Sequence, residues 1–96
     1  MLSSTAQITT DNPQRLITRL CKHWSHKFPV SFDEQRGEIQ LGLGPCVLEA
    51  QQGGLHVRVQ AADSEQLLRL QTIVGEHLQR MAAAPLPEFT WDRQAP

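Results

Sequence analysis

Thiol and imidazole side chains are concentrated in one short segment of the sequence. Residues 20–27 read Leu-Cys-Lys-His-Trp-Ser-His-Lys, and Cys46 and His77 follow further along the chain. Thiolate and neutral imidazole are common ligands of iron and zinc in proteins. One hypothesis is therefore a metal or small-ligand site formed by His23, His26, Cys46 and His77, with iron or zinc as the cofactor.

Helix geometry limits how these groups can combine. At about 100° per residue, Cys21 and His23 lie about 160° apart around a helix and cannot share one ion, whereas His23 and His26 lie about 60° apart and can. A structural zinc takes four ligands, and a catalytic zinc usually takes three plus water. The two imidazoles are therefore a partial site that needs Cys46 and His77. A histidine could also act as general base in a small enzyme, which is the third of our hypotheses.

A purely structural interpretation exists for the same residues. Cys21 and Cys46 both fall on positions expected to face inward, where a reduced cysteine acts as a small apolar side chain. A reactive pair, a ligand pair or a redox switch is the alternative. His77 lies about 60° from the centre of an apolar helical stripe and would then be a hydrogen-bonded histidine at the core edge.

A basic ridge is the clearer surface pattern. Arg15, Arg19, Lys22 and His26 follow one another at spacings of four, three and four, which places them within about 60° of one another on the outer face of a helix. No acidic residue occurs between Pro13 and Phe32, although the chain has a net charge of −1. The ridge is either a solvated face or a surface for an acidic protein partner or a small anionic ligand. We do not expect a nucleic-acid or membrane partner, because the chain has no general positive charge.

Two helices must position these groups. Asn12 and Pro13 are typical of a helix start, and the apolar residues of 13–27 recur at helical spacing before Pro29. The segment Asp-Ser-Glu-Gln at 63–66 resembles a capping box and predicts a second helix to about Ala83. The inward stripes are Leu16, Ile17, Leu20, Cys21, Trp24 and Phe28 in the first helix, and Leu67, Leu70, Val74, Leu78 and Met81 in the second.

The remaining segments predict strands. Residues 38–43, 46–50 and 55–60 alternate apolar and polar side chains, residues 30–32 precede them as a hairpin arm, and 6–10 and 88–93 are shorter candidates. We predict an α+β two-layer sandwich, an antiparallel sheet of about five to six strands with two helices on one face. The other face should carry Glu38, Gln40, Glu49, His56, Arg58 and Gln60.

The size of the chain limits the function. Its 96 residues allow one domain, 1–96, with 1–5 and 94–96 expected to be flexible, and exclude large catalytic scaffolds. The start of the chain has no cationic leader, and no run approaches the roughly 20 apolar residues of a membrane span. We expect a cytoplasmic protein with reduced thiols.

Three motifs resemble a known family. They are P-x-R-L-x-x-x-L-C-K-H-W-x-H-K-x-P-V at 13–30, G-x-C-x-L-x-A at 44–50 and H-L-x-R-M-A at 77–82. The chain resembles the bacterial domain-of-unknown-function family 2218, with L-C-K-H-x-x-H-K as the most specific part. The resemblance covers nearly the whole chain. It implies the fold and the importance of Cys21, His23, His26, Cys46 and His77, but no activity.

No residue pattern therefore identifies an activity. Our leading hypothesis is a small cytoplasmic binding or accessory protein that presents the basic face of its first helix and can form a homodimer through its open sheet face or edges. The second hypothesis is the metal or small-ligand site, and the third is the small enzyme. A shared interior for both helices and the strands would decide where each imidazole and thiol points.

Overall fold

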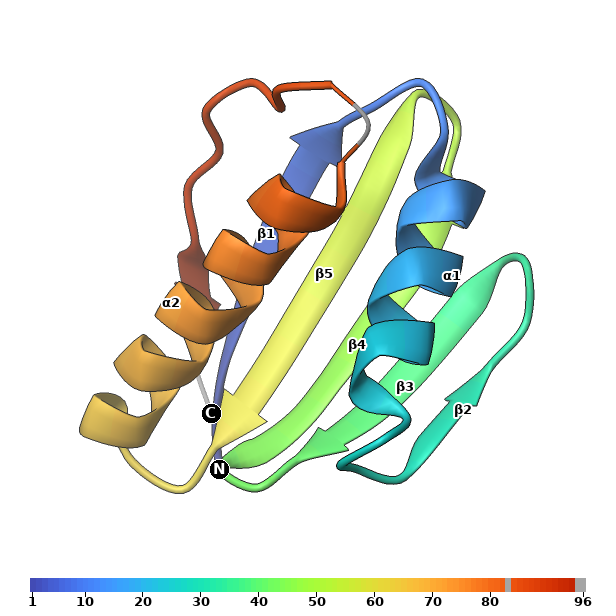
Figure 1. Cartoon of the computed structure of the whole chain (residues 1–96). Helices are drawn as coiled ribbons and strands as arrows, with labels where there is room; N and C mark the ends of the chain where they lie inside the picture. Colours follow the sequence, from blue (N-terminus) through green and yellow to red (C-terminus); the bar gives the residue numbers. More distant parts are fainter. Residues whose placement is uncertain (83, 95–96) are drawn as a thin grey trace.

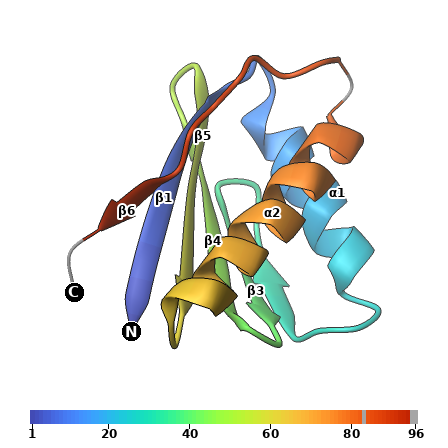
Figure 2. The same ribbon diagram turned by 90° about the vertical axis from the view of Figure 1, so that its left-hand side faces the viewer.

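The chain folds into one helical layer and one sheet layer (Figures 1 and 2). The computed structural model describes residues 1–82 and 84–94. The elements in chain order are β1 (Leu2–Thr9), α1 (Pro13–Trp24), β2 (Val30–Phe32), β3 (Arg36–Leu41), β4 (Gly44–Gln51), β5 (Gly54–Ala61), α2 (Ser64–Met81) and β6 (Asp92–Gln94). The predicted α+β two-layer architecture is confirmed.

The sheet is antiparallel, with the strand order β2-β3-β4-β5-β1-β6. Strands β2 to β5 form a meander of consecutive hairpins, and the N-terminal strand β1 pairs along the whole of β5. Gly53, with φ of 77°, forms the turn between β4 and β5, because a left-handed backbone is readily adopted only by glycine. Both helices cover the same face: α1 packs on β2 to β4, and α2 packs on β5 and β1 (Figure 1).

The core lies between the two layers, as the alternation of residues predicts. Leu20 of α1, Val57 of β5 and Leu78 of α2 all have no exposed surface, so the two helices and the central strand share one interior. The ladder register keeps one side of each strand inward: Cys46, Leu48 and Ala50 oppose Val59, Val57 and Leu55. Removal of this apolar area from water is the main stabilising contribution.

The outer sheet face carries the six polar residues predicted for it. The register follows from the core, because a strand that turns Val57 inward must turn its neighbours His56 and Arg58 outward. Glu49 lies opposite His56 on this face. The polar residues that this alternation turns outward are Glu38, Gln40, Glu49, His56, Arg58 and Gln60.

Both helix starts have the predicted side-chain caps. The Asn12 side chain accepts a hydrogen bond from the Arg15 amide at 3.1 Å, and Asp63 accepts one from the Gln66 amide at 2.8 Å. Each bond satisfies one of the first-turn amides that a helix cannot pair internally. Of the helices that the structure describes, neither is both long and apolar enough to cross a membrane.

Residues 2–5, which the sequence predicted to be flexible together with Met1, belong to strand β1. Leu2–Thr9 is a strand, and Ser3 and Ser4 within it are buried. The sequence did not predict the start of this strand, because Ser3 and Ser4 are polar. The strand is stabilised by backbone hydrogen bonds to β5, which amino-acid composition does not reveal. Gln94, also expected to be flexible, belongs to β6, and the expectation for residues 95–96 lies outside the described residues.

Three element ends also differ from prediction. α1 ends at Trp24 rather than near Lys27, because the amides of Lys27 and Phe28 both bond to the Trp24 carbonyl and close a turn. α2 ends at Met81, and the predicted end at Ala83 lies outside the described residues. The last strand is Asp92–Gln94 rather than 88–93, because β1 offers a partner only to that part.

Candidate functional site

A cavity of about 540 Å³ opens where the C-terminal end of α1 meets α2 and the turn between β3 and β4. This volume is within the range of about 300–1,000 Å³ that is usual for small-molecule sites. We call it the histidine cavity. Its lining residues are His23, Trp24, His26, Lys27, Phe28, Leu41, Gly42, Leu43, Leu70, Ile73 and His77.

The cavity wall is apolar because the inward stripes of three elements end there. Trp24 closes the stripe of α1, Leu41 is the last inward residue of β3, and Leu70 belongs to the stripe of α2, and all three are buried. Ile73 lies outside the stripe of α2 and remains 37% exposed at the cavity. The walls are therefore continuous with the core.

Three aromatic side chains are clustered on the wall formed by the two helices. The His77 ring centroid lies 4.6 Å from that of Trp24 and 5.2 Å from that of His23. The His23 and Trp24 centroids are 6.1 Å apart. These separations are typical of packed aromatic pairs. His23 and His77, which are 54 positions apart in the sequence, thus form one surface.

A hydrogen bond fixes the tautomer of His77. Its Nδ1 lies 2.8 Å from the Ile73 carbonyl oxygen, one helical turn earlier. A carbonyl only accepts, so Nδ1 carries the proton and Nε2 of the neutral ring holds the free lone pair. The predicted hydrogen-bonded histidine at the core edge is therefore present, and its second nitrogen remains available for a ligand.

The predicted four-residue metal site is not assembled. The fold brings His23, His26 and His77 to one cavity, but Cys46 is fully buried in the core on β4, between Ile39 and Val59 of the neighbouring strands. Among residues 1–82 and 84–94, no group of three or more histidine, cysteine, aspartate or glutamate side chains could hold a metal ion. The strand alternation that turns Cys46 inward is the physical reason.

The cysteines behave as core residues. Cys21 and Cys46 are free thiols without exposed surface. Burial raises the pKa of the Cys21 thiol to about 11. Burial, and secondarily the nearby Cys21, raise the pKa of the Cys46 thiol well above its usual range. Neither thiol has the exposure and lowered pKa of a reactive cysteine.

The basic ridge is only partly helical. Arg15, Arg19 and Lys22 are exposed on α1, but His26 lies beyond the end of the helix and lines the histidine cavity. Within the described part of the chain, none of the four forms an ion pair, and the one ion pair found joins Arg36 and Glu38 at 3.4 Å. Partner binding by the ridge stays a prediction.

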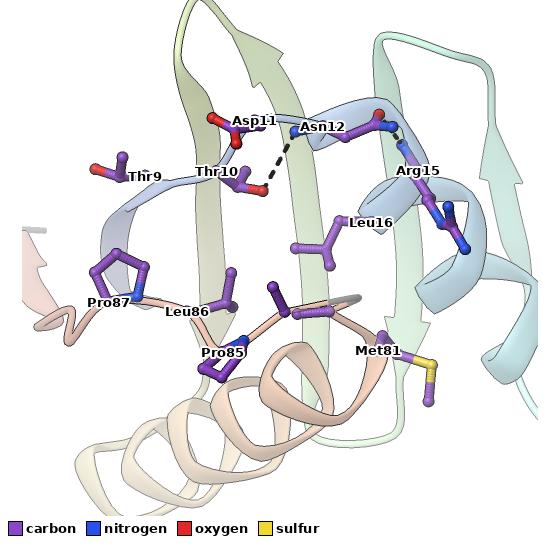
Figure 3. Close-up of a pocket in the computed structure, with 12 residues that line it drawn as sticks. Thr9, Thr10, Asp11, Asn12, Arg15, Leu16, Met81, Pro85, Leu86 and Pro87 are labelled. Carbon is purple, nitrogen blue, oxygen red and sulfur yellow. Dashed lines mark hydrogen bonds between the residues drawn. The ribbon is translucent and has the colours of Figure 1, made fainter.

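A second cavity, of about 350 Å³, lies at the opposite end of α1 (Figure 3). It is bounded by the loop before α1 and by the segment after α2. Leu16 reaches from α1 toward Pro85 and Leu86, and the Asn12 cap to the Arg15 amide lies at its rim (Figure 3). The charged groups of its lining, Asp11 and Arg15, have opposite signs, whereas the histidine cavity brings three imidazoles together.

Sequence reasoning missed several residues of the histidine cavity, among them Lys27, Leu43 and Ile73. One signal was present. Ile73 is an apolar residue outside the predicted stripe of the second helix, and the structure leaves it 37% exposed. Large apolar side chains on a polar helix face often mark a contact surface.

Comparison with known proteins gives a family but no activity. The family model described as "Uncharacterized protein conserved in bacteria (DUF2218)" matches residues 5–92. The NMR structure of PA4090 from Pseudomonas aeruginosa is similar to this chain, with 37% sequence identity, a TM-score of 0.80 and 96% of each chain covered. No curated protein matches the chain. The match over most of the sequence shows that this chain belongs to the DUF2218 family.

Proposed function

We propose that this protein binds a small molecule in the histidine cavity. The observation that carries the proposal is the combination of apolar walls from α1, β3 and α2 with a few polar side chains at one place. Small-molecule sites typically have this composition, in which the apolar area supplies affinity and the polar groups fix orientation. The proposal keeps the small-ligand hypothesis for His23, His26 and His77 and leaves out Cys46.

Two features support this proposal over the basic ridge as the main site. The cavity surrounds one space with apolar surface from three elements, whereas the ridge is a row of charged side chains on the exposed face of α1 and just beyond its end. His77 is also held by its bond to the Ile73 carbonyl and by packing on Trp24, so little side-chain entropy is lost when a ligand binds. The enzyme hypothesis would need its histidines at a common cavity; His23 and His77 both line this one, and that hypothesis stays a prediction.

Binding can be tested by two-dimensional NMR with three naphthalene probes, namely 2-naphthoate, 2-naphthamide and 2-(aminomethyl)naphthalene. We expect at least one probe to shift the indole N–H signal of Trp24. The chain has two tryptophans, so Trp91→Phe assigns that signal. If no probe shifts Trp24 or the neighbouring amides at millimolar concentration, the proposal is wrong.

A matched pair of variants locates the binding. Ile73→Glu places a negative charge at the cavity, whereas Leu68→Glu places the same side chain on the same helix outside it. Both positions are exposed, so both variants should fold. We expect Ile73→Glu to abolish the shifts caused by 2-naphthoate and Leu68→Glu to preserve them. Equal loss in both variants would place the binding elsewhere.

A further inference from the structure

The histidine cavity has an unbalanced set of charges. Four side chains that can carry positive charge line it: His23, His26, Lys27 and His77. Among the residues that the structure describes, no aspartate or glutamate lines it, although the chain has ten acidic residues. Within the same described residues, none of the four forms an ion pair. Within the described lining, no carboxylate therefore balances the positive charge that these side chains can carry.

The groups that can be charged all come from the two helices and the turn after α1, whereas the turn between β3 and β4 contributes only apolar residues and a glycine. His23, His26 and Lys27 belong to the end of α1 and the turn after it, and His77 joins them, since its ring lies 5.2 Å from that of His23. The turn between β3 and β4 contributes Leu41, Gly42 and Leu43, and the earlier part of α2 contributes Leu70 and Ile73. A ligand that contacts both sides needs an apolar body and one anionic end.

We infer that the ligand of the histidine cavity is a small aromatic carboxylate, whose ring lies against Trp24 and the leucine side of the cavity and whose carboxylate faces Lys27 and the histidines. This inference rests on the proposed function and specifies its ligand class. An aromatic body fits because Trp24, Phe28 and the imidazoles offer ring faces and edges, which favour offset or edge contacts with another ring.

The hydrogen bond of His77 limits how this residue can contact the anionic group of a ligand. Its Nδ1 proton is held by the Ile73 carbonyl, so only Nε2 is available to the ligand. Nε2 donates to a carboxylate when the ring is protonated, which produces a charge-assisted hydrogen bond. Lys27 favours an anion over a cation, and His23 and His26 add to this preference when their rings are protonated.

The three naphthalene probes test this inference because they share one ring system. 2-Naphthoate is an anion, 2-naphthamide is its neutral isostere, and 2-(aminomethyl)naphthalene is a cation. We expect 2-naphthoate to bind at least about tenfold more tightly than 2-naphthamide, which corresponds to one charge-assisted contact. We expect the cation to bind more weakly than the amide.

Lysine variants identify the source of the preference. Lys27→Met removes the charge at the cavity and keeps an apolar stem, and Lys22→Met makes the same change on the exposed face of α1 outside the cavity. We expect Lys27→Met to weaken 2-naphthoate binding severalfold and leave 2-naphthamide binding unchanged. Lys22→Met should change neither.

The outcomes separate the two proposals. If 2-naphthamide binds in the cavity as tightly as 2-naphthoate, the inference about the carboxylate is wrong and the proposed function stands. If Lys22→Met weakens 2-naphthoate as much as Lys27→Met does, the preference reflects overall charge, and the inference is again wrong. If none of the three probes binds in the cavity, both proposals fail.

Discussion

Gly37 of β3 leaves the space that the Cys21 sulfur of α1 occupies. A β-carbon added to Gly37 would lie 2.6 Å from the Cys21 Sγ and 3.2 Å from the Cγ2 of Ile17. The glycine thus lets α1 approach the sheet closely. His23 and Trp24 follow Cys21 on the same helix and line the histidine cavity. The close approach of α1 to the sheet at Gly37 therefore also affects where these two side chains lie.

Gly37→Ala should therefore destabilise the protein by about 1–3 kcal/mol, the usual cost of overpacking a core. Chemical unfolding in urea measures the change. Gly42→Ala is the control, since a β-carbon there meets nothing within 4 Å. The destabilisation should be smaller in a Cys21→Ala background, because the sulfur is then gone. Equal destabilisation in both backgrounds would contradict this account of the contact.

The buried thiols should make stability depend on alkaline pH. The pKa of Cys21 rises from 9.0 to about 11 on burial, so above pH 9.0 the unfolded chain loses a proton that the folded chain keeps. The unfolded state then binds fewer protons, and the free energy of unfolding falls as pH rises from about 9 to about 11. Cys46 contributes with the same sign.

The pH dependence can be measured by urea unfolding under reducing conditions. Between about pH 8 and about pH 11, the free energy of unfolding of the wild type should fall by up to about 2–3 kcal/mol more than that of Cys21→Ala. This difference is the free energy that corresponds to a pKa shift of about two units. The difference between the two proteins isolates the thiol from lysines that also titrate. Identical pH profiles for the wild type and Cys21→Ala would contradict the prediction.

The Ser4 side chain is buried against the helical layer without a hydrogen-bond partner among the described residues. An unpaired buried hydroxyl has lost its hydration without compensation. Ser4→Ala should therefore raise the free energy of unfolding by about 1 kcal/mol. Ser3→Ala, on the opposite face of β1, should give no such gain. A loss of stability in Ser4→Ala would reveal a partner for the hydroxyl, such as a buried water molecule.

The basic ridge should bind an acidic polymer if it is a docking surface. We expect binding to poly-L-glutamate at low ionic strength that weakens with added salt, because exposed charges are screened. Arg15→Glu combined with Arg19→Glu should weaken binding at least about tenfold. Arg58→Glu combined with Arg93→Glu changes the net charge equally at exposed positions outside the ridge and is the control. Equal weakening in both pairs would contradict a specific ridge.

The sequence predicted what depends on local periodicity. The spacing of Leu16, Leu20 and Trp24 determines an amphipathic helix, and the alternation around Val57 determines which side of β5 faces the core. The buried state of both cysteines and the polar outer sheet face follow from the same patterns. The tight turn after Trp24 was not predicted, because hydrogen bonds to one carbonyl ended α1 before its apolar pattern did.

The candidate site was predicted only in part. The sequence singled out His23, His26 and His77, but it also grouped Cys46 with them and placed His26 on the ridge. The sequence by itself determined which side chains face inward, because periodicity acts within each element. Only the tertiary structure decided which imidazoles meet at a cavity and that Cys46 is excluded from it, because those distances depend on how α1, α2 and the turn after β3 pack together.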